Sequence, residues 1–106
     1  MKVRHKYNAI RCEADGIKFP SKKERDYYLY LREKERSGEL LFHLRQVPFS
    51  LPGGVKYFLD FMEFWKTDEE GVVDIKFTEV KGRVLPMGSL KIKQAESIYN
   101  IHISVI

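Results

Sequence analysis

Apolar and polar residues alternate with a period of two along residues 56–65 and again along residues 72–80. This alternation predicts two strands, because successive side chains of a strand point to opposite faces of a sheet. The polar segment 66–71 between them predicts a connecting loop. A shorter apolar run over residues 40–44 predicts a buried strand, which we expect to end at the break in residues 46–48.

Helix signals precede and follow these strands. Start and stop residues predict one helix over residues 22–36 and a second over residues 90–99. Two short strands joined by an Asp-Gly turn are predicted within residues 9–19. Residues 101–105 alternate again and predict a last strand. The order strand, helix, strands, helix, strand indicates the α/β class, as an α+β fold with a mixed sheet and helices packed on it.

A length of 106 residues predicts a single domain, residues 1–106, because a chain of this size buries one core. Hydrophobic residues make up 43% and charged residues 32% of the chain, a balance typical of globular rather than disordered proteins. We find no apolar run of about 18 residues and no signal sequence. The single cysteine, Cys12, cannot form an internal disulfide. We therefore expect a cytoplasmic protein.

The net charge is +4, and the positive residues are concentrated in a few segments. A basic surface favours a polyanionic partner such as nucleic acid. We expect DNA phosphates to contact the basic tail at residues 1–8 and both predicted helices. Taken by itself, the tail is interpreted more simply as a frayed, solvated segment. The expected DNA-binding residues are Arg4, Lys6, Lys22, Lys23, Arg25, Lys91 and Lys93.

A carboxylate interrupts an apolar row in the first long strand. Tyr57, Leu59 and Phe61 are expected to share one face of this strand, and Asp60 lies in the apolar row of the other face. A lone aspartate in such a row is costly unless it is paired, hydrogen-bonded or bound to a metal. Asp60 is therefore a candidate functional residue.

In the second long strand, the apolar row continues into Glu79 and Lys81. If the loop centres on its acidic residues, Asp60 lies opposite residues 77–79, on the same face as Glu79 and Lys81. Diagonal neighbours in such a ladder lie about 7–8 Å apart or less, so both carboxylates can reach one cation. Structural ion pairs of Lys81 with Asp60 and Glu79 are the alternative interpretation.

Glu24 heads the apolar stripe of the first predicted helix, because Tyr27, Tyr28 and Leu31 follow it at helical spacing. A functional carboxylate at this position would face the core. Ser21 and Glu24 also fit a capping box, in which the glutamate only caps the helix. Spacing alone leaves both interpretations open.

These residue types suit one particular metal. Mg²⁺ prefers hard oxygen ligands, usually one or two carboxylates completed by water and substrate phosphate. Asp60 and Glu79 supply two carboxylates, and the carbonyl of Val80 offers a third oxygen. Lys81 can orient or deprotonate the attacking water, or offset charge on the phosphate. The expected cofactor is Mg²⁺, for which Mn²⁺ can substitute.

Other chemistries have weaker support in the sequence. Cys12 has no evident catalytic partner, and the histidines His5, His43 and His102 are scattered. His43 and His102 fall in apolar strand patterns, so we interpret both as packing residues. The chain has no glycine-rich phosphate loop, which argues against a nucleotide hydrolase.

Two motifs, Tyr-Phe-Leu-Asp-Phe at residues 57–61 and Thr-Glu-Val-Lys-Gly at residues 78–82, resemble the PD-(D/E)XK nuclease superfamily. In that superfamily an aspartate in one strand precedes Glu-x-Lys in the next. The segments 16–24, 38–40 and 46–49 are similar to a family of small phage and prophage proteins. That family is related to phage endonuclease I and Holliday-junction resolvases, and the similarity covers nearly the whole chain.

The resemblance implies a restriction-endonuclease-like core with one composite site. Asp60 and Glu79 would ligate the metal, Lys81 would be the catalytic lysine, and Glu24 would complete the site directly or through water. Leu59 stands where the superfamily often has proline. Further residues expected near the site are Gln46 and either Lys93 or Gln94.

The implied activity is that of a Mg²⁺-dependent DNA endonuclease that hydrolyses phosphodiester bonds and selects branched DNA such as Holliday junctions. Such an enzyme would act in phage recombination or DNA processing in the cytoplasm of a bacterial host. A homodimer is expected, because a symmetric junction offers two scissile strands to a protein with two-fold symmetry. The alternative is a non-catalytic nucleic-acid-binding module of the same fold, which the intact set of two acids and a lysine disfavours.

Overall fold

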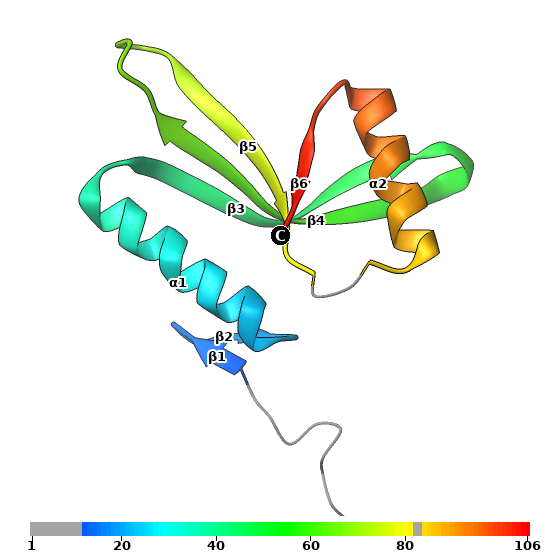
Figure 1. The fold of residues 1–106 in the computed structure, drawn as a ribbon, viewed down its shortest axis with the longest axis horizontal. Helices are drawn as coiled ribbons and strands as arrows, with labels where there is room; N and C mark the ends of the chain where they lie inside the picture. The colour runs from blue at the N-terminus through cyan, green and yellow to red at the C-terminus, as the bar shows by residue number, and fades with distance from the viewer. Residues whose placement is uncertain (1–11, 82–83) are drawn as a thin grey trace, which may run out of the picture.

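The computed structural model describes residues 12–81 and 84–106 (Figure 1). Its centre is a four-stranded mixed sheet with the strand order β3-β4-β5-β6. The first three strands in this order are antiparallel neighbours, and the fourth runs parallel to β5. The strands are β3 (Leu40–Leu51), β4 (Val55–Lys66), β5 (Val73–Glu79) and β6 (Ile103–Val105).

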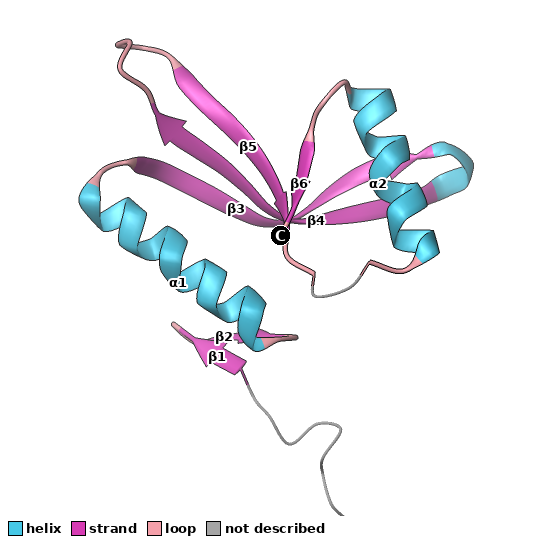
Figure 2. Cartoon of the chain, viewed as in Figure 1, coloured by secondary structure: helices cyan, strands magenta, loops and turns pink. Residues whose placement is uncertain are grey.

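Two helices, α1 (Lys22–Ser37) and α2 (Pro86–Tyr99), flank this sheet (Figure 2). A short hairpin of β1 (Cys12–Ala14) and β2 (Ile17–Phe19) precedes α1, and a single 3₁₀ turn, η1 (Pro52–Gly54), joins β3 to β4. The predicted α+β class with a mixed sheet is confirmed. The first residues of the predicted N-terminal hairpin lie outside the described part of the chain.

The ends of α1 follow directly from the sequence. The side chain of Ser21 accepts a hydrogen bond of 3.1 Å from the backbone N–H of Glu24, which satisfies one unpaired donor of the first turn. Gly38 ends the helix with a φ of 86°, a conformation that glycine adopts without strain. The helix predicted over residues 22–36 is confirmed to within one residue.

β3 differs from its prediction in length and burial. A buried strand ending before residues 46–48 was expected, but β3 continues through Pro48 to Leu51. β3 is an edge strand, where proline is tolerated because one side of the backbone has no strand partner. Leu41, Phe42 and Leu44 are 46–50% exposed, so this apolar run is not a buried one.

The core has two parts, one beneath each helix, and the β3–β4 hairpin passes from one to the other (Figure 1). Phe61 packs in the cluster beneath α1, whereas Leu59 packs in the cluster beneath α2. The predicted shared face therefore does not give these two residues a shared core. Leu59, Asp60 and Phe61 are all buried, and Gln46 in the neighbouring strand has a φ of 53°. Asp60 thus lies where the two clusters meet.

The two described histidines differ from each other. The ring of His43 packs near Tyr28 and Phe61, and its Nδ1 lies 2.7 Å from Oε2 of Glu35, which confirms it as a packing residue. His102 is not one, because its side chain is 85% exposed and precedes β6. Within residues 12–81 and 84–106, neither helix is both long and apolar enough to cross a membrane.

Candidate active site

The register of β4 and β5 brings the two strand carboxylates together. Phe61 pairs with Thr78 in this antiparallel ladder, so the next position along places Asp60 opposite Glu79. The prediction that Asp60 faces residues 77–79 is confirmed. Both residues are buried: 4% of the surface of Asp60 and 2% of the surface of Glu79 are exposed.

Both oxygens of Asp60 accept hydrogen bonds. Oδ2 accepts a bond of 2.9 Å from the backbone N–H of Val80, and Oδ1 accepts one of 3.1 Å from the side-chain amide of Gln46. Gln46 therefore lies at the site, as predicted. Val80 contributes its N–H, and its side chain is buried in the cluster beneath α1. The predicted role of the Val80 carbonyl as a metal ligand stays a prediction.

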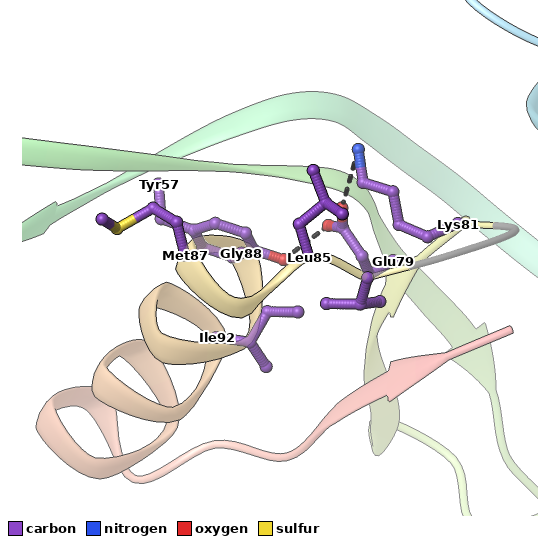
Figure 3. A pocket seen from close by; sticks show the side chains of 8 residues that line it. Tyr57, Glu79, Lys81, Leu85, Met87, Gly88 and Ile92 are labelled. Atoms are coloured by element: carbon purple, nitrogen blue, oxygen red, sulfur yellow. Dashed lines mark hydrogen bonds and ion pairs between the residues drawn. The ribbon is translucent and has the colours of Figure 1, made fainter.

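Glu79 lies between a tyrosine and a lysine (Figure 3). The hydroxyl of Tyr57 donates a hydrogen bond of 2.5 Å to Oε1, and Nζ of Lys81 lies 3.3 Å from Oε2. Lys81 is at the edge of the site, with 47% of its side chain exposed. Sequence reasoning missed Tyr57, because it counted this residue only as part of an apolar row.

Glu24 joins the site from the first turn of α1. Only 2% of the surface of Glu24 is exposed. Among the described residues, the cationic group nearest to its Oε2 is Nη2 of Arg45, at 3.7 Å. That distance is too long for a hydrogen bond, and within the described residues Oε2 has no hydrogen-bond partner. The Ser21 half of the capping box is present, but the Glu24 carboxylate lies inside the protein. Arg45 was not predicted as a site residue.

Burial dominates the protonation of the two glutamates. Burial raises the pKa of the Glu24 carboxyl above its usual range, and the nearby charge of Asp60 raises it further, although Arg45 opposes the shift. Burial also raises the pKa of the Glu79 carboxyl, and the hydrogen bond from Tyr57 offsets only part of that increase. Both groups therefore ionise less readily than an exposed glutamate.

The positive groups do not balance this negative charge. Partial burial by itself would lower the pKa of the Lys81 ammonium. The surrounding carboxylates have the larger combined effect, so the pKa is raised above its usual range. Asp60 and the two glutamates, when ionised, carry three negative charges, against one positive charge each on Lys81 and Arg45. A buried site with excess negative charge favours binding of a cation.

Asp60 and Glu79 could hold a magnesium ion only together with ligands from water and substrate. In the described ranges, 12–81 and 84–106, no three Asp, Glu, His or Cys side chains are grouped closely enough to hold a metal ion by themselves. Mg²⁺ usually binds through one or two carboxylates and takes its remaining ligands from water and phosphate. Among the described residues, Oε2 of Glu24 has no hydrogen-bond donor, and a buried carboxylate oxygen without a donor is rare, so this atom is also available to a cation.

The predicted DNA-binding residues lie in different places. Lys22 and Lys23 are exposed in the first turn of α1, and Nζ of Lys23 donates a hydrogen bond of 3.3 Å to the carbonyl of Lys81. Arg25 pairs with Asp26 at 3.1 Å, so its charge is partly neutralised. Among the described residues, no hydrogen bond or ion pair joins Lys91, Lys93 or Gln94 to Glu24, Asp60 or Glu79. Arg4 and Lys6 lie outside the described residues.

Fold and site together define an α+β domain with a buried group of carboxylates where its two core clusters meet. The family model described as "Protein of unknown function (DUF1064)" matches residues 4–102, so the chain belongs to this family. No curated protein and no solved structure matches the chain.

Proposed function

We propose that the protein is a metal-dependent DNA endonuclease of the PD-(D/E)XK type, which hydrolyses phosphodiester bonds. The observation that carries the proposal is the convergence of Asp60, Glu79 and Lys81 from two neighbouring strands, with Glu24 reaching them from α1. Burial of three carboxylates is unfavourable for folding, and binding of a cation offsets that cost.

Asp60 and Glu79 would hold Mg²⁺ or Mn²⁺, with the carbonyl of Val80 as a further oxygen and Glu24 acting directly or through water. The chemistry that the metal supplies when bound is neutralisation of phosphate charge and activation of water. The ion pair with Glu79 keeps Nζ of Lys81 protonated. Lys81 would then offset the charge that develops on the reacting phosphate rather than accept a proton.

We further propose branched DNA as the substrate and phage recombination or DNA processing, in the bacterial cytoplasm, as the setting. The exposed start of α1 supports DNA as the partner, because Lys22 is exposed there and Lys23 bonds the backbone of the catalytic lysine. Phosphate contacts at this point would deliver the backbone to the carboxylates.

An apolar surface on the sheet face opposite α1, which we name the open sheet face, supports a homodimer. A pair of such faces would bury apolar surface on both copies, as the centre of an interface that needs roughly 800 Å² per partner including a polar rim. None of its main residues is charged, so a second copy meets it without repulsion. These residues, 41–47% exposed, are Phe42, Leu44, Val73 and Ile75.

A cleavage assay tests the proposed function. Wild-type protein is incubated with end-labelled junction, flap, single-stranded and linear duplex DNA in Mg²⁺, and a parallel series contains a chelator. Asp60→Asn is the matched control, because asparagine keeps the size of the side chain and removes its charge. We expect metal-dependent cleavage of branched DNA by the wild type alone. Binding without cleavage in Mg²⁺ and in Mn²⁺ would instead identify a non-catalytic DNA-binding module.

A further inference from the structure

A cavity of about 250 Å³ lies next to the candidate active site, between the end of β5 and the start of α2 (Figure 3). Glu79 and Lys81 form its polar edge, and the ring of Tyr57 forms part of its wall. Tyr57 is also the hydrogen-bond donor to Glu79, so the wall of the cavity contacts the carboxylate directly. The other lining residues are Val84, Leu85, Met87, Gly88 and Ile92.

The cavity combines apolar walls with backbone donors that make no hydrogen bond among the described residues. The first hydrogen bond within α2 runs from the N–H of Ser89 to the carbonyl of Leu85. The N–H groups of Met87 and Gly88 precede that bond, so they have no partner inside the helix, and both residues line the cavity. A ligand with a flat apolar face and a hydrogen-bonding edge suits these walls and donors.

The size of the cavity selects a single ring system. An apolar cavity of about 150 Å³ holds benzene, and sites for larger ligands begin at about 300 Å³. A volume of about 250 Å³ lies between these values and accommodates one nucleobase.

We propose that this cavity receives one unstacked nucleobase from the nucleotide beside the reacting phosphate, which would lie near Lys81. The inference rests on the proposed nuclease function and gives it a substrate class. A base inside an intact duplex cannot enter such a cavity, and extrusion costs least where pairing is already interrupted. The preferred substrate is therefore DNA with an unpaired or weakly paired base at the cleavage point, as at a branch.

Gly88 allows the cavity to be filled without disturbing the fold. A Cβ atom at this position would lie 3.6 Å from Cγ1 of Val84, an ordinary contact, and the backbone needs no left-handed conformation there. Gly88→Leu extends a side chain toward the cavity, and Gly88→Ala is the matched control. Both residues favour the helix more than glycine does, so neither variant is expected to melt below the wild type.

The test uses junction DNA with 2-aminopurine, a base that fluoresces more strongly when it is unstacked, beside the branch point. In Ca²⁺, the wild type and Gly88→Ala should raise the fluorescence, and Gly88→Leu should not. In Mg²⁺, Gly88→Leu should lower kcat/KM for junction cleavage about 5- to 150-fold, the range for loss of one stacked base.

Each outcome decides the inference. Wild-type cleavage with unchanged fluorescence, or equal cleavage by the leucine and alanine variants, overturns the cavity assignment and leaves the nuclease standing. Absence of any DNA binding or cleavage by the wild type overturns both. Should Gly88→Leu fail to fold, the fluorescence of the wild-type complex alone decides between entry of the base and none.

Discussion

Replacing Glu24 with glutamine distinguishes a residue of the metal site from a residue that only caps α1. The wild-type carboxylate is buried, Oε2 has no hydrogen bond among the described residues, and the charge of Asp60 is nearby. A buried polar group without a partner costs about 1–3 kcal/mol. Glutamine removes the charge but leaves a polar amide, so we expect only part of this cost to be recovered. The free energy of unfolding should rise by about 1 kcal/mol, and the melting temperature by about 4–8 °C.

The stability that Glu24→Gln gains over the wild type should depend on pH. The pKa of Glu24 is raised in the folded state above its ordinary value of 4.5, so the folded protein binds this proton more tightly than the unfolded chain. The penalty of the carboxylate is present above the folded-state pKa and disappears as pH falls toward 4.5. In a chelator, the advantage of Glu24→Gln over wild type should therefore shrink as pH is lowered.

Thermal melting and junction cleavage are measured on the same preparations, with a chelator and with Mn²⁺. We expect Glu24→Gln to gain stability in the chelator, to gain less than wild type from Mn²⁺, and to cleave about 10- to 100-fold more slowly. A variant that loses stability and keeps full activity would refute this reasoning. Glu24 would then be a structural residue of α1.

Further predictions concern charge, packing and assembly. Lys81→Ala should abolish cleavage in Mg²⁺ while leaving DNA affinity in Ca²⁺ close to wild type; a proportional loss of both would make Lys81 a phosphate contact. Replacing Lys22 and Lys23 by glutamine should reduce the slope of log affinity against log salt by about 1.8, and an unchanged slope would leave them as solvated surface. Tyr57→Phe should lower the free energy of unfolding by about 1–3 kcal/mol in a denaturant titration, because a buried carboxylate loses its donor; an unchanged value would contradict this. Ile75→Lys should convert a dimer to a monomer in light scattering, and a monomeric wild type would refute the open sheet face as an interface.

The pairing of Asp60 with Glu79 was predictable because it depends on local quantities. Strand alternation assigns side chains to faces, and the length of the loop between β4 and β5 limits the register to a few positions. Both quantities are contained in one short segment of sequence. The helix cap at Ser21 and the end of the helix near residue 36 are equally local, and both were predicted.

The change of core at Asp60 was not predictable in this way. A period of two assumes that a strand keeps one face toward one core, but β4 crosses from the cluster beneath α2 to the cluster beneath α1. Leu59 and Phe61 are apolar in either arrangement, so their identity carries no signal of the crossing. The positive φ of Gln46 in the neighbouring strand is a further irregularity. Glutamine rarely adopts such a conformation, so its presence in the sequence does not predict one.

The partners of the carboxylates depend on contacts between distant segments. Arg45 reaches Glu24 from an edge strand, and its guanidinium lies over the ring of Phe19, 4.6 Å from the centroid. Tyr57 reaches Glu79 across the sheet. The contact of Arg45 with Glu24 does not follow from spacing along the chain, because it needs the relative placement of β3 and α1. The contact of Tyr57 with Glu79 joins strands whose pairing was predicted, but strand alternation assigned Tyr57 and Asp60 to opposite faces. An alignment of related sequences, in which such pairs vary together, is the signal that could have found them.

The distances within the site depend on how the long β3–β4 hairpin bends between the two halves of the domain, one built on α1 and the other on α2. Glu24 belongs to the half built on α1, whereas Tyr57 belongs to the half built on α2, and the hairpin is shared by both. A few degrees of bending at Asp60 would change the separation of these groups while leaving each half intact. Substitutions in either hydrophobic cluster would therefore reduce the activity of the site before they unfold the protein. A ligand that joins the carboxylates would hold the hairpin at one curvature.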